Sequence, residues 1–330
     1  EQFLSDGGHF ELSPMYHNIL LWDLLDLINL ARLIEGKIPS STVNFWVTVA
    51  ESAMYWLDVM MHPDGEISFF NDSAFGIAAS PRELKQYAKN LGIQDTNSIK
   101  QTLISLDRSG YSRINQTAYS IIFDHAEVGP DYLPAHGHAD SLSFECSIGT
   151  ERLIVNSGTS IYGVSAERLR QRKTPAHSTV VVDNCDSSEV WSGFRVARRA
   201  GAKLNIKSCD GNEVHLSAEH DGYKRLSGKV MHSRSIFSSP MKFIINDSLV
   251  GSYNQAYAIY HLHPDVKVKV LSDFQVSLTL PSGICILVSS GGHIVVLSSS
   301  WHPRFGTSID SLCLKLQISS DEISAEFSLI

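Results

Sequence analysis

Apolar residues recur every three or four positions through residues 17–36, HNILLWDLLDLINLARLIEG. This spacing is the period of an amphipathic helix, and a glycine and a proline follow that end one. A second helix is expected after Ser40, a helix-capping residue, and it should run to the turn HPDG at residues 62–65. A third is predicted over residues 80–92, because Ser-Pro opens that segment. The pattern therefore predicts a helical layer over about the first hundred residues.

The pattern changes after about residue 108. Segments such as TAYSIIFDH, KFIINDSLV and VKVKVL alternate or run apolar with many β-branched residues, and Gly, Asp, Asn and Ser turns separate them. Only the short basic segment at residues 166–172 is compatible with another helix. Helices followed by many strands indicate segregated domains rather than a parallel α/β sheet. We therefore predict an α+β fold with a helical domain at residues 1–105 and a strand domain at residues 106–330.

Composition limits the classes of partner. The chain has 330 residues, 43% of them hydrophobic, and no apolar run near the roughly 20 residues that span a bilayer. Its net charge of -8 argues against a nucleic-acid binder, which usually has a basic excess. The sequence begins with neither an initiator methionine nor a signal pattern, so we expect that a targeting segment has been removed. A polyanionic ligand would need a local basic patch.

The densest polar cluster is YLPAHGHAD at residues 132–140, which leads directly into an apolar strand. His136 and His138 are two residues apart, so an extended backbone points both imidazoles to one side. Together with Asp140 they suit a metal site or a base with its orienting partner. The alternative is a surface loop whose histidines make only local hydrogen bonds.

A second cluster places Arg168, Arg170, Arg172 and Lys173 within six residues, just before His177 and the strand STVVVD. Within an acidic protein this is the local patch that a carboxylated or sulfated sugar would require. A solvated charged loop is the alternative reading. His177 fits either a metal ligand or a half-buried strand residue.

The third cluster, SDGGHFELSPMYH at residues 5–17, places Tyr16 and His17 at the start of the first helix, where free N–H groups favour anions. A tyrosine there can transfer a proton, or it can simply anchor the helix. Asn71-Asp72 is a weaker candidate, because such pairs more often form turns.

Five segments, in order, resemble the heparinase II/III-like polysaccharide lyases: DGGHFELSPMYH, HPDGEISFFNDSAFGIA, GPDYLPAHGHADSLSFE, LIVNSGTSIYG and RKTPAHSTVVVD. They cover most of the first two hundred residues. The resemblance implies that residues 1–105 are the C-terminal part of an α/α toroid and that residues 106–330 form an antiparallel β-sandwich. It also implies cleavage of uronic-acid polysaccharides, in the heparan, alginate or exopolysaccharide class, by β-elimination.

The same resemblance implies roles for individual residues. Tyr16 matches the tyrosine that acts as acid, with a role as base left open, and His136 matches the histidine that assists proton transfer. Substrate contacts are expected at Glu11, His17, Tyr162 and Arg172 within the matching segments, and at Arg168 in the basic cluster. The family's group that neutralises the uronate carboxylate usually lies well upstream, so the chain resembles the C-terminal part of a longer lyase.

Some members of this family bind a structural zinc ion, and the matching positions here are His138, Asn156 and His177. Asn156 stands where the family has aspartate, and a neutral amide is a poorer zinc ligand than a carboxylate. The family also implies a periplasmic or secreted bacterial protein.

Two other functions stay open at this point. The chain could be a relative that binds acidic polysaccharide without cleaving it. It could also be a metal-dependent glycan hydrolase built on His136, His138, Asp140 and His177. Neither the particular polysaccharide nor the oligomeric state follows from the sequence.

Overall fold

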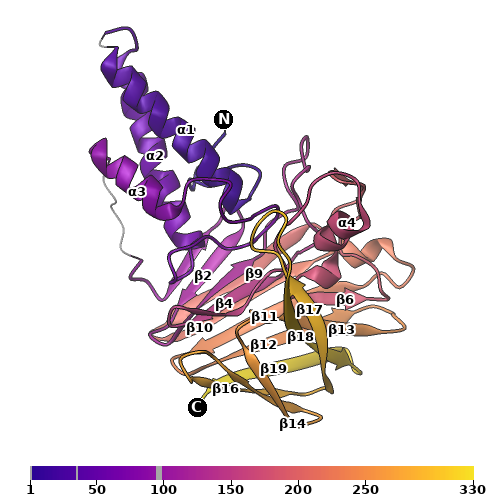
Figure 1. The fold of residues 1–330 in the computed structure, drawn as a ribbon. Helices are drawn as coiled ribbons and strands as arrows, with labels where there is room; N and C mark the ends of the chain where they lie inside the picture. Colours follow the sequence, from indigo (N-terminus) through magenta and orange to yellow (C-terminus); the bar gives the residue numbers. More distant parts are fainter. Residues whose placement is uncertain (1, 35, 94–98) are drawn as a thin grey trace.

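The computed structural model describes residues 2–34, 36–93 and 99–330, and it places a helical layer before a strand-rich body (Figure 1). Residues 1, 35 and 94–98, which the predicted helical domain includes, lie outside this description. The third described helix ends at Asn90, and the first strand begins at Leu103. The predicted α+β class is confirmed.

The helical layer contains three helices whose ends follow from local capping: α1 (Pro14–Leu33), α2 (Ser40–Met60) and α3 (Pro81–Asn90). Helix α1 starts three residues earlier than its apolar period indicates, because the Ser13 hydroxyl accepts from the backbone N–H of Tyr16 at 3.2 Å. Ser80 and Glu83 cap each other at the start of α3. No described helix is long and apolar enough to span a bilayer.

A five-stranded antiparallel sheet follows the helices and has the order β1-β2-β3-β4-β5: β1 (Leu103–Leu106), β2 (Tyr111–Asn115), β3 (Tyr119–Asp124), β4 (Phe144–Ile148) and β5 (Glu151–Ile154). Every residue of β3 and β4 is buried, which explains their continuous apolar runs. One face packs on α2, where Trp56 and Val59 meet Tyr111 and Ile122. The other face packs on the remaining strands.

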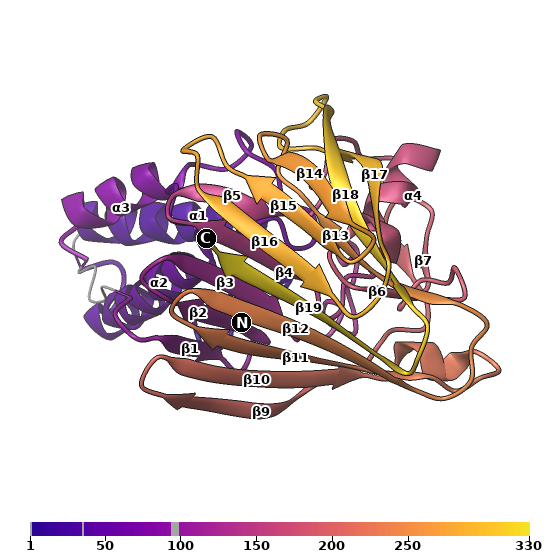
Figure 2. The ribbon, with the colours of Figure 1, turned by 90° about the horizontal axis from the view of Figure 1, so that it is seen from below.

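The main sheet has eight antiparallel strands in the order β14-β15-β16-β19-β12-β11-β10-β9: β9 (Ala202–Asp210), β10 (Glu213–His220), β11 (Met231–Ser239), β12 (Lys242–Val250), β14 (Lys267–Ser272), β15 (Gln275–Thr279), β16 (Cys285–Ser290) and β19 (Glu322–Leu329). Burial alternates along β11 and β12, as expected for strands with one face in the core. The inward rings of Phe243 and Phe327 stack with centroids 4.6 Å apart. Figure 2 shows this sheet from below.

Four further strands form a third sheet in the order β17-β18-β13-β6: β6 (Val180–Val182), β13 (Ala256–His261), β17 (Ile294–Trp301) and β18 (Ile309–Ile318). One apolar core joins the three sheets, since Phe123, Phe243 and Leu314 belong to the same buried cluster. The strand domain is thus a layered antiparallel sandwich, as predicted. Smaller elements lie between strands: α4 (Ala166–Arg172), η1 (Thr174–Ala176), η2 (Gly222–Arg225) and the hairpin β7 (Val190–Trp191) with β8 (Arg195–Val196).

Buried polar contacts fix the helical layer to the sandwich. His62, at the end of α2, contacts the Glu145 carboxylate at 2.6 Å and the Ser147 hydroxyl at 2.7 Å. The Arg152 guanidinium pairs with Asp64 in the following turn at 2.7 Å. These contacts hold the two layers in one arrangement, so side chains from both can form a single site.

Candidate active site

The Asp72 carboxylate is the centre of the candidate site. It is fully buried and accepts hydrogen bonds from His136 Nδ1 at 2.9 Å, His138 Nε2 at 2.9 Å, Arg168 Nη2 at 2.7 Å and Thr159 Oγ1 at 3.2 Å. Burial alone would raise the pKa of Asp72, but the histidine and arginine donors hold this pKa well below its ordinary value. A permanently ionised carboxylate therefore orients two histidines.

His136 is turned by this carboxylate toward the helical layer. A neutral imidazole carries its proton on one nitrogen, and the bond to a carboxylate assigns that proton to Nδ1. Nε2 is then the nitrogen with a free lone pair. The side chain is 16% exposed, in contrast to the fully buried Asp72. His136 is thus arranged as a partly exposed proton acceptor.

Tyr16 comes from the other layer and stands against His136. The two ring centroids are 4.1 Å apart, and the Tyr16 hydroxyl contacts the Tyr162 hydroxyl at 3.0 Å. The ring of Phe194 lies 6.0 Å from His136 and 5.1 Å from Tyr162. Burial raises the pKa of Tyr16, so its phenol is protonated at neutral pH.

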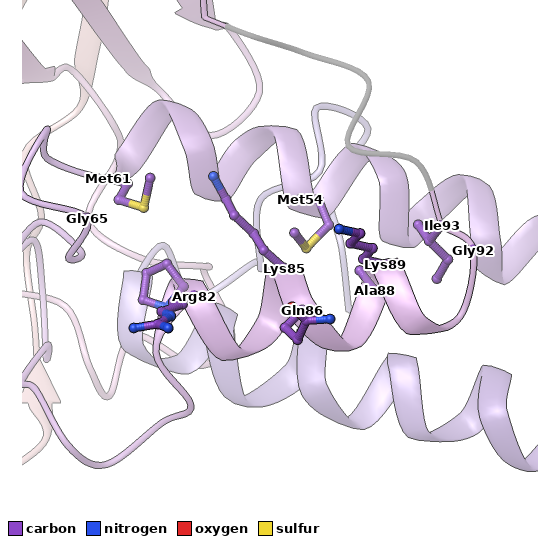
Figure 3. A pocket seen from close by; sticks show the side chains of 11 residues that line it. Met54, Met61, Gly65, Arg82, Lys85, Gln86, Ala88, Lys89, Gly92 and Ile93 are labelled. Atoms are coloured by element: carbon purple, nitrogen blue, oxygen red, sulfur yellow. The ribbon is translucent and has the colours of Figure 1, made fainter.

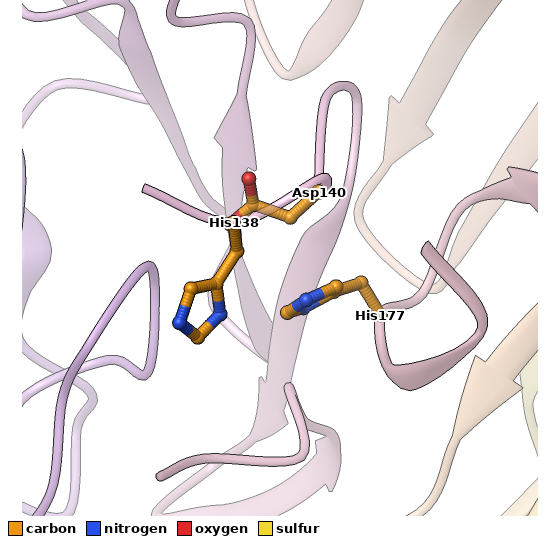
Figure 4. Close-up of side chains that lie close together, drawn as sticks. All are labelled: His138, Asp140 and His177. Carbon is orange, nitrogen blue, oxygen red and sulfur yellow. The ribbon is translucent and has the colours of Figure 1, made fainter. Parts of the chain in front are cut away.

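A second cluster is connected to Asp72 through His138 and consists of His138, Asp140 and His177 (Figure 4). One ligand atom from each lies within 4.8 Å of the others, and all three residues are buried. Within the described part of the chain, His138 Nδ1, Asp140 Oδ2 and His177 Nε2 have no hydrogen-bond partner. Buried polar atoms are normally paired, so three neighbouring exceptions fit a bound cation.

The histidine tautomers also fit a metal. His138 donates through Nε2 to Asp72, which leaves the lone pair on Nδ1 free. His177 Nδ1 lies 3.3 Å from the Asn156 amide oxygen, which leaves the lone pair on Nε2. Burial lowers the pKa of His138 to about 4, so its ring is neutral as a metal requires. Two histidines and one carboxylate are a common donor set for zinc.

The ligand set of His138, Asn156 and His177 stays a prediction, and the three donors that lie together here differ from it in one member. Asn156 holds the ring of His177 from behind, at the nitrogen that would face away from an ion. Asp140 supplies the carboxylate in the cluster instead. From the sequence, Asp140 and His177 were grouped only in the alternative of a metal-dependent hydrolase, because their proximity depends on how the turn at Asp140 folds back toward His177.

Three residues expected to contact substrate lie inside the protein. Arg168 and Arg172 are fully buried, and Arg172 Nη2 donates to the carbonyl of Gly137 at 2.9 Å. His17 is also fully buried, with Nε2 at 3.0 Å from the carbonyl of Ala53. Their positions support the site rather than line it, which departs from the expectation of direct contact.

The other two residues expected to contact substrate, Tyr162 and Glu11, are less deeply buried. Tyr162 is partly buried beside Tyr16, and the Arg168 guanidinium lies 5.0 Å from its ring centroid. The Glu11 side chain is 12% exposed, and burial raises its pKa. Direct contact of Glu11 and Tyr162 with a substrate stays a prediction.

From the sequence, Asp72 was only a weaker candidate and Phe194 was not identified as a site residue. Asp72 follows the buried run ISFFN and had been interpreted as a turn residue, and Phe194 lies in the β7–β8 hairpin without a recognisable motif. Both gain their role from contacts across the fold. The position of Asp72 directly after an apolar run was the local sequence feature that indicated its role.

A separate cavity of about 800 Å³ lies between α2 and α3 (Figure 3). Met54 and Met61 line it together with Arg82, Lys85 and Lys89. None of its lining residues belongs to the clusters around Asp72 or His177. We therefore place the candidate chemistry at Tyr16 and His136 and not in this cavity.

Two protein-family models match the chain. The model described as "Heparinase II/III N-terminus" matches residues 1–96, and the model described as "Heparinase II/III-like, C-terminal" matches residues 99–323. No curated protein matches the sequence significantly.

Solved structures share the fold. "Heparinase III" gives a TM-score of 0.82 at 16% identity, over 100% of this chain and 55% of that one. A heparan sulfate lyase from Pedobacter heparinus gives 0.77 at 17% identity, over 99% and 53%. Chondroitinase AC lyase gives 0.55 at 11% identity, over 99% and 56%. The chain thus spans about half the length of each structure, and at these identities the likeness concerns the fold.

Proposed function

The chain belongs to the heparinase II/III-like family, and we propose that it carries the acid and base of a lyase that cleaves uronic-acid polysaccharides by β-elimination. The sequence motifs had indicated the same family. The observation that carries the proposal is the contact between Tyr16 and His136, whose rings lie 4.1 Å apart although one comes from the helical layer and the other from the sandwich. A sugar bound where the two layers meet would contact both.

The first step is removal of the proton at C5 of the uronate. His136 is suited to it, because the hydrogen bond to Asp72 leaves Nε2 unprotonated and pointed away from the carboxylate. The negative charge of Asp72 stabilises the imidazolium that forms when the proton arrives. The electron pair of the C5–H bond becomes the C4–C5 double bond.

The second step is departure of the glycosidic oxygen from C4 with a proton. Tyr16 is suited to donate it, because its raised pKa keeps the phenol protonated and Tyr162 holds the hydroxyl at 3.0 Å. Reprotonation of Tyr16 and deprotonation of His136 restore the site. A base role for Tyr16 would require a lower pKa than this environment gives.

A zinc ion held by His138, Asp140 and His177 would supply a fixed positive charge beside Asp72 and would tie together the two segments that carry these ligands. The proposed ligands are connected to His136 through Asp72, which supports a structural role for the ion. Arg168 and Arg172 support the same region by binding Asp72 and the carbonyl of Gly137.

The proposed substrate is an acidic polysaccharide of the heparan type, since heparinase III and the Pedobacter heparan sulfate lyase share the fold. Alginate and other uronate exopolysaccharides belong to the same chemical class. A periplasmic or secreted location is part of this proposal.

The test is to incubate the protein with heparan sulfate, chondroitin sulfate, alginate and a uronate exopolysaccharide, and to follow the ultraviolet absorbance of the unsaturated product. Growth of this absorbance supports elimination. New reducing ends without absorbance would show a hydrolase, and binding without either product would show a non-catalytic relative. Either of these last results would contradict the proposal.

A further inference from the structure

A cavity of about 550 Å³ lies beside the candidate catalytic residues. It is lined by residues 131–135, residues 163–164, residues 192–196 and Arg199. Its lining includes Phe194, whose ring lies 6.0 Å from His136 and 5.1 Å from Tyr162. Phe194 therefore joins the cavity to the rings of His136 and Tyr162. A polysaccharide chain bound at these rings would extend into the cavity.

The walls of this cavity present apolar side chains to solvent. Tyr132 is 76% exposed, Val164 is 84% exposed and Phe194 is 36% exposed, and Leu133 is exposed as well. Soluble proteins seldom gather large exposed apolar residues in one place without a binding role. Aromatic faces suit the C–H faces of sugar rings, because such rings are apolar on their faces and polar at their edges.

Among the described residues that line the cavity, Arg195 is a cation free to bind an anion. Arg199 pairs with Asp131 at 3.3 Å, and Arg198 pairs with Glu189 at 2.6 Å. Arg195 lines the cavity and is exposed, and no ion pair involves it among the described residues. A guanidinium in this state matches the planar geometry of a carboxylate or the oxygen edge of a sulfate.

The wall that carries Arg195 is held in place from inside. Arg168 Nε donates to the carbonyl of Gly193 at 2.9 Å, and its guanidinium lies 5.1 Å from the Phe194 ring centroid. Arg172 Nη1 donates to the carbonyl of Arg195 at 3.3 Å. The same arginines bind Asp72 and Gly137, so the cavity wall and the catalytic histidines share one support. A preformed wall lowers the ordering cost of binding.

We propose that this cavity is a sugar subsite beside the cleavage point, in which Arg195 binds the anionic group of a carboxylated or sulfated sugar while Tyr132 and Phe194 contact its ring. The inference rests on the proposed function, because the sugar is a neighbouring residue of the same polysaccharide. It assigns substrate recognition to Arg195, in place of the buried Arg168 and Arg172.

The test compares Arg195→Ala with Arg198→Ala, an exposed arginine on the same stretch of chain whose charge already pairs with Glu189. The dissociation constant is measured for uronate oligosaccharides of increasing length, in a sulfated series from heparan sulfate and an unsulfated series from alginate. We expect Arg195→Ala to weaken binding about 10- to 100-fold for oligosaccharides long enough to reach the cavity, from the usual strength of a charged hydrogen bond. Disaccharide binding and the Arg198→Ala variant should stay unchanged.

Loss confined to the sulfated series would identify sulfate as the bound group, and loss in both would identify the carboxylate. Equal affinity of Arg195→Ala and unaltered protein at every length would overturn the subsite. Length-dependent binding that requires Arg195, without any unsaturated product, would overturn the proposed elimination and leave the subsite standing. If Arg195→Ala cleaves oligosaccharides of every length as fast as the unaltered protein, the subsite is overturned and the proposed elimination stands.

Discussion

Asp72 and His136 are 64 residues apart in the chain, yet the Asp72 carboxylate lies 2.9 Å from His136 Nδ1. This contact joins the segment between α2 and α3 to the loop before β4. It decides which nitrogen of His136 carries the proton and which one faces a substrate. The chemistry of the site depends on it.

Replacing Asp72 with asparagine tests that dependence. The variant keeps the shape of the side chain but can hold the wrong tautomer and no longer stabilises a charged imidazole. We expect kcat to fall by about two to four orders of magnitude, with a smaller change in KM. Arg168 would lose its buried counterion, so unfolding should be measured alongside. The exposed Asp310→Asn variant is the control, and an unchanged kcat in Asp72→Asn would contradict the assigned role.

Metal content tests the exchange of ligands between Asn156 and Asp140. If zinc binds at the unpaired atoms of His138, Asp140 and His177, the purified protein should contain about one zinc per chain by elemental analysis. Asp140→Ala and His177→Ala should lose it. Asn156→Ala should keep it when zinc is in excess, with affinity reduced about 10- to 100-fold, as for other residues that orient a ligand. If Asn156→Ala contains no zinc and Asp140→Ala keeps it, the ligand set predicted from the sequence is correct.

Acid should destabilise the protein through His17. Its Nε2 faces the carbonyl of Ala53, and its Nδ1 lies 3.2 Å from the backbone nitrogen of His9 and accepts its hydrogen bond. Protonation of Nδ1 would place an N–H group against the N–H group of His9. Burial lowers the pKa of His17 to about 3, whereas the unfolded value is about 6.5. Between the two pKa values only the unfolded chain takes up the proton. The free energy of unfolding therefore decreases as the pH is lowered from about 6.5 to the folded pKa.

The size of this effect is about 1.4 kcal/mol per pH unit for each such histidine. Denaturant unfolding of the unaltered protein at about pH 6.5 and about pH 5 should differ by about 2 kcal/mol more than in His17→Gln. His293→Gln is the matched control, because the His293 side chain is 53% exposed. Identical pH slopes in the unaltered protein and in His17→Gln would disprove the account.

The buried Arg234–Asp247 pair should contribute strongly to folding. Arg234 Nε lies 2.7 Å from Asp247, and Nη1 donates to the carbonyls of Leu142 and Ser178, which adjoin the segments carrying Asp140 and His177. Removing one partner leaves a buried charge, so Arg234→Ala should lower the free energy of unfolding by about 3–5 kcal/mol. Arg198→Ala breaks an exposed pair and should have little effect on thermal unfolding. Equal melting temperatures for the two variants would contradict this.

Local features of the sequence account for most of the fold. The apolar period located α1 and a Ser-Pro start located α3, because a helix and its caps depend on neighbouring residues. The continuous apolar runs located β3 and β4. The order of the three sheets was not predictable from these patterns, because it depends on pairing between distant strands such as β12 and β19.

The site was predictable only in part, for the same reason. His136 and His138 were found because they are adjacent and precede a strand. Asp72 was only a weaker candidate, since its partners come from three other segments. The basic cluster was read as a surface patch, but the short helix α4 turns Arg168 and Arg172 inward, and no local pattern shows which face of one helical turn is buried.

The most direct test of the account is kcat on a cleaved uronate polymer for Tyr16→Phe beside Tyr253→Phe. Tyr253 lies between β12 and β13, and its hydroxyl bonds the carbonyl of Ser320, far in sequence from the site. If Tyr16 donates the proton to the leaving oxygen, removing its hydroxyl should lower kcat by about two to four orders of magnitude, while Tyr253→Phe keeps the original rate. A Tyr16→Phe protein that forms unsaturated product at the original rate would contradict the central claim.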